Sequence, residues 1–209
     1  MEDSFEAKGE SARGAGKGTP ATGDEQELVS HLHGGFRFCP ELIGLPAEGR
    51  LLAHVRELPF KDFDFHGYTG KRRVVSFGWH YDFSERHLRK ADDIPDFLLA
   101  LRETAAAFAG MESEEFQHVL VTEYDTGAGI GWHRDKAVFG EVVGVSLLSQ
   151  CVFRMRRLVS KKNWERVNLI AEPRSAYYLS GPARSEWEHS IPQMDALRYS
   201  ITFRNVRED

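Results

Sequence analysis

The chain has 209 residues, 41% of them hydrophobic, which is enough for one domain with a real core and a tail. It lacks both an apolar run of about eighteen residues and a secretory signal pattern, so we expect a cytoplasmic protein without a membrane partner. Its two cysteines lack Cys-x-x-Cys spacing, which argues against a disulfide framework or a dithiol redox site. We also expect a monomer.

The net charge of −5 is unevenly distributed along the chain. Residues 1–27 hold seven acids and three bases, are rich in Gly, Ser, Ala and Thr, and show no helical or strand period. This composition predicts a disordered acidic tail. Residues 28–209 carry the remaining −1 and are expected to form a single domain. Their nearly neutral balance neither supports nor excludes a polyanionic partner.

Helical patterns precede strand patterns in this sequence. The spacing of apolar residues predicts a strand at 36–39, helices at 46–57 and 94–109, and a strand at 73–78. From residue 116 onward the pattern favours strands, at 116–124, 142–149, 151–157, 166–171, 175–180, 189–192 and 197–205. Helices followed by about seven strands indicate the α+β class, with a double-sheet antiparallel barrel or jelly roll as the core, at about 116–206.

Residues 58–70 combine many aromatics with glycines in a polar segment. One interpretation is a loop folded over the core. The other is an aromatic lid over a substrate, because binding groups concentrate on loops. With the segment up to the second helix, such a lid would span about 58–90.

His133 and Asp135 follow a glycine-rich turn and stand two residues apart. Alternation along an extended segment would put both side chains on one side, as two ligands for one divalent metal. His189 is the candidate third ligand, because two histidines and one carboxylate leave open positions on a non-haem Fe(II). Taken singly, His-x-Asp more often marks a hydrogen-bonded turn, and a lone His is more often structural.

Arg198 and Arg204 are six residues apart in a strand that is otherwise apolar in alternation, so both are expected on one face. Guanidinium groups directed into a sheet interior need anionic partners, because an unpaired buried charge is costly. A dicarboxylate such as 2-oxoglutarate would supply one negative group for each arginine.

With these motifs the chain resembles the AlkB-like Fe(II)- and 2-oxoglutarate-dependent dioxygenases over roughly residues 73–204. The resemblance rests on the segments 122–124, His133-Arg-Asp135, 145–149, 180–189 and 198–204. It implies a double-stranded β-helix core, with the N-terminal helices packed on one sheet and a substrate-covering lid. It also implies Fe(II) held by His133, Asp135 and His189, with O2 as oxidant and 2-oxoglutarate held by Tyr124, Arg198, Arg204, Thr122 and Ser200. The family commonly has Asn at the last two positions, and the hydroxyls here have a shorter reach.

The resemblance implies oxidation at carbon. Oxidation of an N-methyl group releases formaldehyde, while 2-oxoglutarate is converted to succinate and CO2. The segment that covers the substrate pocket in the family is similar to residues 73–84. We therefore expect substrate contacts from Arg73, Phe77, Trp79, Tyr81 and, in a basic segment discussed next, Arg154.

Residues 151–166 contain six bases against one acid, a local net charge of +5. Basic residues follow phosphates, and interleaved aromatics stack on bases, so alkylated DNA or RNA is the first substrate hypothesis. A solvated hairpin would explain the same charges. Two alternatives stay open: an AlkB-like oxygenase that hydroxylates or demethylates a protein side chain, and a non-catalytic jelly-roll binding module.

Overall fold

The computed structural model describes residues 34–65, 68–82 and 87–207. The predicted acidic tail, residues 1–27, lies outside the described residues. In chain order the elements are β1 (Phe36–Cys39), α2 (Leu45–Val55), β2 (Lys61–Phe65), β3 (Tyr68–Phe77), β4 (Trp79–Asp82), β5 (His87–Lys90), α3 (Asp96–Ala109), the 3-10 turn η1 (Ser113–Glu115), β6 (His118–Tyr124), β7 (Ile130–His133), β8 (Phe139–Leu147), β9 (Cys151–Ser160), β10 (Asn163–Ala171), β11 (Ala176–Leu179), α4 (Gly181–Ser185), β12 (Glu188–Ile191) and β13 (Arg198–Val206).

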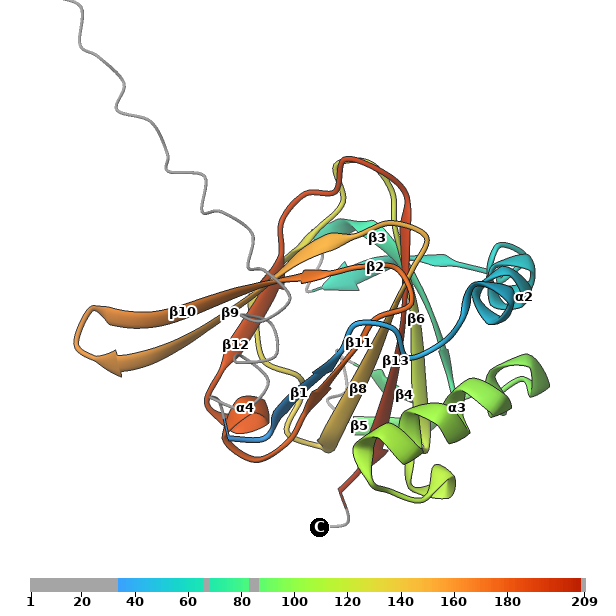
Figure 1. The fold of residues 1–209 in the computed structure, drawn as a ribbon, viewed down its shortest axis with the longest axis horizontal. Helices are drawn as coiled ribbons and strands as arrows, with labels where there is room; N and C mark the ends of the chain where they lie inside the picture. Colours follow the sequence, from blue (N-terminus) through green and yellow to red (C-terminus); the bar gives the residue numbers. More distant parts are fainter. Residues whose placement is uncertain (1–33, 66–67, 83–86, 208–209) are drawn as a thin grey trace, which may run out of the picture.

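Two antiparallel sheets form the core of the fold (Figure 1). The larger has the strand order β1-β11-β8-β13-β6-β3-β2, and the smaller has the order β10-β9-β12-β7. Apolar side chains from the inner faces of both sheets make one buried cluster, which includes Tyr124, Phe153 and Ile191. This confirms the predicted α+β fold with a jelly-roll core.

The central strand β13 shows how the sequence builds two different faces. Side chains alternate along a strand, so Tyr199, Ile201 and Phe203 project to one side and belong to the buried cluster beneath the helices. Arg198 and Arg204 project to the other side, between the two sheets, and are also buried. The larger sheet therefore has an apolar face toward the helices and a polar strip toward the smaller sheet.

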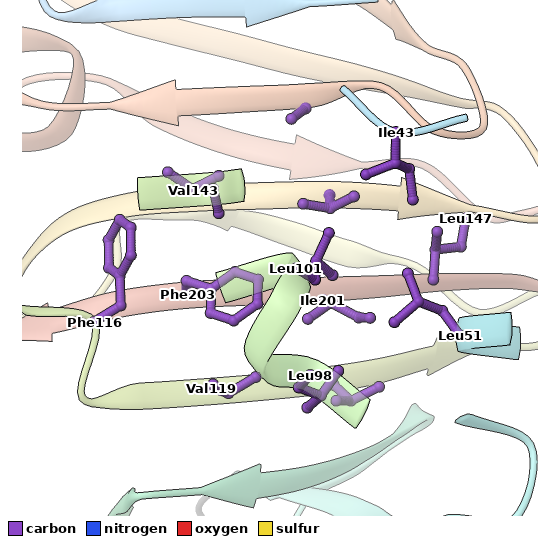
Figure 2. Close-up of a cluster of buried hydrophobic side chains, with 14 of the residues drawn as sticks. Ile43, Leu51, Leu98, Leu101, Phe116, Val119, Val143, Leu147, Ile201 and Phe203 are labelled. Carbon is purple, nitrogen blue, oxygen red and sulfur yellow. The ribbon is translucent and has the colours of Figure 1, made fainter. Parts of the chain in front are cut away.

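Helices α2 and α3 cover the apolar face of the larger sheet (Figure 1). Figure 2 shows Leu98 and Leu101 of α3 lying over Ile201 and Phe203 of β13. Burial of each such leucine contributes about 1.5–3 kcal/mol, which holds the helix on the sheet. The helix ends at Gly110, whose φ of 72° is a left-handed conformation that glycine adopts without steric cost.

The aromatic segment 58–70 is not the loop that one interpretation expected. It forms β2 and the start of β3, an antiparallel hairpin with an irregularity between Asp62 and Phe63. β3 continues by pairing with β6 and so extends the larger sheet. Gly70 pairs with Phe63 next to this irregularity, so it lies within a hairpin rather than in an open loop. The role of residues 58–90 as a lid stays a prediction.

Among the described helices, none has the length and apolar character required to cross a membrane.

Candidate metal centre and anion site

His133 and His189 lie opposite each other on neighbouring strands of the smaller sheet. β7 ends at His133, and the register of β12 against β7 pairs His189 with it. Their ring centroids are 4.2 Å apart. Gly129 permits this close approach of the two strands, because a Cβ there would lie only 2.8 Å from the Ile191 carbonyl oxygen. The two imidazoles therefore meet on the inner face of the sheet.

Asp135 joins the histidines from the connection that follows β7. Because the strand ends at His133, strand alternation does not place this carboxylate, in contrast to the argument from the two-residue spacing. Asp135 Oδ2 lies 3.7 Å from His189 Nε2. Arg204 binds the other carboxylate oxygen, with Nη2 at 2.7 Å and Nε at 2.9 Å from Asp135 Oδ1.

The short helix α4 fixes the connection that carries Asp135. Arg184 donates from Nη2 to the carbonyl oxygens of Lys136, at 2.7 Å, and Phe139, at 2.8 Å. Arg134 donates to the Ser185 carbonyl oxygen at 3.0 Å. Arg184 was not expected at the site, because its spacing from the other site residues in the sequence gives no signal for this role.

The protonation states at the site suit metal ligands. Burial lowers the pKa of His189 to about 3, with a contribution from His133, and burial also lowers the pKa of His133. Burial alone would raise the pKa of Asp135, but the charge of Arg204, followed by His189 and His133, holds it far below its usual range. Two neutral imidazoles and one carboxylate are the forms that bind a divalent metal.

The free nitrogen of His133 and the distance between Asp135 and His189 are compatible with a shared metal ion. Nδ1 of His133 lies 2.9 Å from the Gly131 carbonyl oxygen. A carbonyl oxygen can only accept a hydrogen bond, so Nδ1 carries the proton of the neutral ring and Nε2 of His133 keeps its lone pair free for a metal. Two ligand atoms at about 2.1 Å from one metal lie at most about 4.2 Å apart, which accommodates the Asp135–His189 separation. As they stand, no three His, Cys, Asp or Glu side chains in the described residues form a closed metal-binding cluster.

We expect the metal-free protein to lose stability as the pH falls below about 6.5. Histidine in the unfolded chain titrates near 6.5, whereas the pKa of His189 is about 3 when folded. Between these values the unfolded state binds more protons, so acid favours unfolding; His118 and His133 act in the same direction. Urea unfolding in the presence of a chelator should give a lower midpoint at about pH 5 than at about pH 7. An equal or higher midpoint at the acidic pH would contradict these assignments.

Arg198 offers a buried guanidinium with an unused donor. Its Nε donates to Ser146 Oγ at 3.0 Å, and its Cζ lies 5.3 Å from the centre of the Tyr124 ring. Its Nη1 is buried and has no hydrogen-bond partner among the described residues. The register places Ser200 between Thr122 and Ser146 on the adjacent strands, so buried hydroxyls lie on the same face of the sheet as the guanidinium. The site therefore suits an anionic group, because an unpaired buried donor is costly.

Arg204 has a different environment from Arg198. Two of its nitrogens bind Asp135, and Nη1 lies 3.4 Å from His118 Nδ1. The expected arrangement, one guanidinium for each carboxylate of a co-substrate, is therefore not what these contacts show. In this structure Arg204 orients the Asp135 carboxylate.

Arg72, not Arg73, is directed toward the site. Arg73 pairs with Glu123 at 2.6 Å on the face of the larger sheet that meets the helices, where Glu123 also accepts from Tyr199. By alternation Arg72 projects to the opposite face, where its Cζ lies 3.7 Å from the centre of the Phe63 ring. Burial lowers the pKa of Arg72, and Tyr124 is near enough to act on its charge. Arg73 was the residue expected from the sequence; the pairing of Val74 with Thr122, which puts Arg72 on the site face, is known only from the register of β3 against β6.

The other predicted substrate residues are dispersed. Phe77 is part of the buried cluster beneath the helices, so it is a core residue. Tyr81 lies near the site, with Lys136 Nζ 5.3 Å from its ring centre, and Trp79 is on the same short strand, β4. Arg154 lies on the outer face of the smaller sheet, because its neighbours Phe153 and Met155 point inward.

Comparison with known proteins places this site in a family. The model of the 2OG-Fe(II) oxygenase superfamily matches residues 59–204. A relative from Arabidopsis thaliana, named alkylated DNA repair protein ALKBH8 homolog, is 26% identical over 211 residues. That alignment covers 83% of this chain but 58% of the relative, so the chain spans little more than half of its length.

Two solved structures share the fold. The structure of OsALKBH1 matches with a TM-score of 0.57 at 17% identity, covering 82% of this chain and 96% of that one. A Pseudomonas putida prolyl-4-hydroxylase matches with a TM-score of 0.57 at 13% identity, covering 88% of this chain and 96% of that one. The chain therefore belongs to the 2OG-Fe(II) oxygenase superfamily, whose members use Fe(II), 2-oxoglutarate and O2, and it is similar to AlkB homologues within it.

Proposed function

We propose that this protein is an oxidative demethylase of N-alkylated nucleic-acid bases. His133, Asp135 and His189 hold Fe(II), and Arg198 binds a carboxylate of 2-oxoglutarate. One observation carries the proposal: two neutral imidazoles and an ionised carboxylate meet between the sheets, in the same interior as the unpaired Nη1 of Arg198. The catalytic domain spans residues 28–209, with the jelly-roll core at about 116–206.

Iron held by His133, Asp135 and His189 would supply the oxidising chemistry, in which O2 and 2-oxoglutarate give succinate and CO2 and the second oxygen atom of O2 enters a C–H bond of the substrate. Hydroxylation of an N-methyl group gives a hemiaminal, whose N–C bond then breaks as the hydroxyl proton passes to the nitrogen, and formaldehyde is released. The residues of this chain position the reactants. Arg204 fixes the orientation of Asp135, and the hydroxyls of Thr122 and Ser200, together with Tyr124, line the co-substrate site beside Arg198.

Charge and position support a nucleic-acid substrate. The basic segment 151–166 forms β9, the turn and the start of β10, which project from the body as a long hairpin (Figure 1). Arg72 and Tyr81 approach the site from β3 and β4 and are suited to contact a phosphate or a base. The Arabidopsis relative, by its name, is a homologue of an alkylated DNA repair protein.

A protein substrate is the second candidate. The fold matches the P. putida prolyl-4-hydroxylase as closely as it matches OsALKBH1, with the same TM-score. The fold therefore does not favour either substrate class, and experiments on residues at the site have to decide between a nucleic-acid and a protein substrate. Membership of an oxygenase family decides against the non-catalytic binding module.

A panel of methylated DNA and RNA oligonucleotides, with formaldehyde and the demethylated base as readouts, tests the proposal. We expect release from at least one methylated base. Arg72→Ala should lower kcat/KM for that oligonucleotide about 10-fold to 100-fold, because hydrogen bonds of charged groups contribute roughly 1.5–3 kcal/mol. Turnover of 2-oxoglutarate without substrate should persist.

Arg73→Ala is the matched control, since Arg73 is the neighbour of Arg72 on the opposite face of β3. It removes the same charge but should leave kcat/KM for the oligonucleotide within about twofold, with thermal unfolding reporting any loss of the Glu123 pair. Active 2-oxoglutarate turnover without release from any methylated base would reject the nucleic-acid substrate. Methylated peptides would then be tested with the same readout.

A further inference from the structure

The outer face of the smaller sheet carries aromatic and basic side chains away from the metal site. Phe153, Met155 and His189 point inward, so Arg154 and Arg156 of β9 point outward. The register of β10 places Arg166 and Asn168 beside them. Trp132 of β7 and Trp164 of β10 lie at the two sides of this row.

Arg156 is held between two indole rings. Its Cζ lies 4.3 Å from the centre of the Trp132 ring and 4.3 Å from that of Trp164. Its Nε donates to Glu188 Oε2 at 2.7 Å, which fixes the guanidinium in place. Both indoles remain partly exposed. We call Trp132, Arg154, Arg156, Trp164 and Arg166 the outer platform.

Two arginines of the outer platform have no acidic partner. Arg154 donates to Ser190 Oγ at 3.0 Å, and its Cζ lies 5.1 Å from the centre of the Trp132 ring. Arg166 is exposed and contacts the Trp164 carbonyl oxygen at 3.4 Å. Within the described part of the chain, neither forms an ion pair with a carboxylate. Glu188 is paired with Arg156, which leaves Arg154 and Arg166 without a carboxylate partner among the described residues, so the outer platform has a net positive charge.

We propose that the outer platform binds a single-stranded stretch of nucleic acid next to the base that reacts. The inference rests on the proposed function for its substrate class and adds a second contact surface to it. Exposed indoles stack on unpaired bases regardless of sequence, and guanidiniums without acidic partners pair with phosphates. Bases of a duplex are stacked on one another and do not offer these faces. The imidazoles of His133 and His189 project from the opposite face of the same sheet, so the two surfaces do not overlap.

Binding of the 209-residue chain to labelled, unmethylated oligonucleotides of about twelve nucleotides tests the proposal. We expect tighter binding of single strands than of duplexes. Trp164→Ala should raise Kd for the single strand about tenfold with little change in the salt dependence, because it removes stacking. Arg166→Glu should raise Kd to a similar degree and reduce the slope of log K against log salt by about 0.7 for each lost phosphate contact.

Two variants at exposed positions of α2, on the far side of the molecule, are the controls. Leu45→Ala removes exposed apolar surface, and Arg50→Glu makes the same charge reversal as Arg166→Glu. Both should keep Kd within about twofold of the unchanged protein. Thermal unfolding of all four variants checks that each is folded.

A third measurement separates this proposal from the proposed function. Formaldehyde release from a methylated fragment of about three nucleotides, too short to reach the outer platform, should be the same for Trp164→Ala and the unchanged protein. If no methylated fragment or oligonucleotide reacts, the proposed function fails while the binding results still stand. If Trp164→Ala and Arg166→Glu bind single strands as tightly as the unchanged protein, the platform proposal is wrong. It is also wrong if the protein binds anionic vesicles but not oligonucleotides, and Arg166→Glu weakens this binding to vesicles.

Discussion

Replacing His133 by alanine should abolish succinate formation from 2-oxoglutarate. The side chain lies within 4.2 Å of His189, ring centre to ring centre, and its Nε2 is the nitrogen left free by the contact of Nδ1 with Gly131. Loss of a partner outside the first coordination shell already lowers metal affinity or activity about 10-fold to 100-fold. Loss of a ligand itself should therefore lower turnover by more than about 100-fold. Iron content after anaerobic reconstitution, measured by atomic absorption, should fall with it.

His54→Ala is the matched control for this substitution. His54 is exposed on α2, where its ring stacks on Phe97 with centroids 4.9 Å apart, and it belongs to the opposite side of the larger sheet. It should keep both iron content and turnover within about twofold. Full turnover and a full complement of iron in His133→Ala would overturn the metal assignment.

The strands of the core could be predicted from the sequence because burial enforces their period. β13 was expected at 197–205 and is found at Arg198–Val206, with its two arginines buried on one face. A slip of one residue would move both charges into the apolar cluster beneath the helices, so the pattern allows one register. The same reasoning explains why β6 and β8, its neighbours in the larger sheet, were also found near their expected positions.

Residues that lie outside a strand with alternating buried side chains could not be placed from the sequence in the same way. Asp135 lies beyond the end of β7, and its contact with Arg204 comes from chain 69 residues away. The choice between Arg72 and Arg73 depends on the register of β3 against β6, which composition does not reveal. Arg154 was grouped with the substrate residues by charge, but alternation puts it on the outer face of the smaller sheet. Charge and residue type predicted the chemistry of the site. Which face of a sheet each side chain occupies depends on how the strands pair, which only the structure shows.

Replacing Arg198 should separate co-substrate binding from stability. Its Nη1 is buried and has no partner in the part of the chain that the structure describes, and such an unpaired donor costs about 1–3 kcal/mol. Arg198→Met removes this group in a similar volume. We expect KM for 2-oxoglutarate to rise about 10-fold to 100-fold, while the free energy of unfolding without 2-oxoglutarate stays equal or increases.

The thermal shift produced by 2-oxoglutarate measures the same loss directly. A ligand that binds only the folded state raises stability as RT ln(1 + [L]/Kd), so the shift should largely disappear in Arg198→Met. Arg198→Lys keeps the charge but not the planar fork, and it should recover only part of the affinity. Ser146→Ala is the control: it removes the acceptor of the Nε hydrogen bond but leaves the guanidinium, so its effect on KM should be smaller. An unchanged KM and thermal shift in Arg198→Met would show that the co-substrate binds elsewhere, because no other change in that variant could restore a lost carboxylate contact.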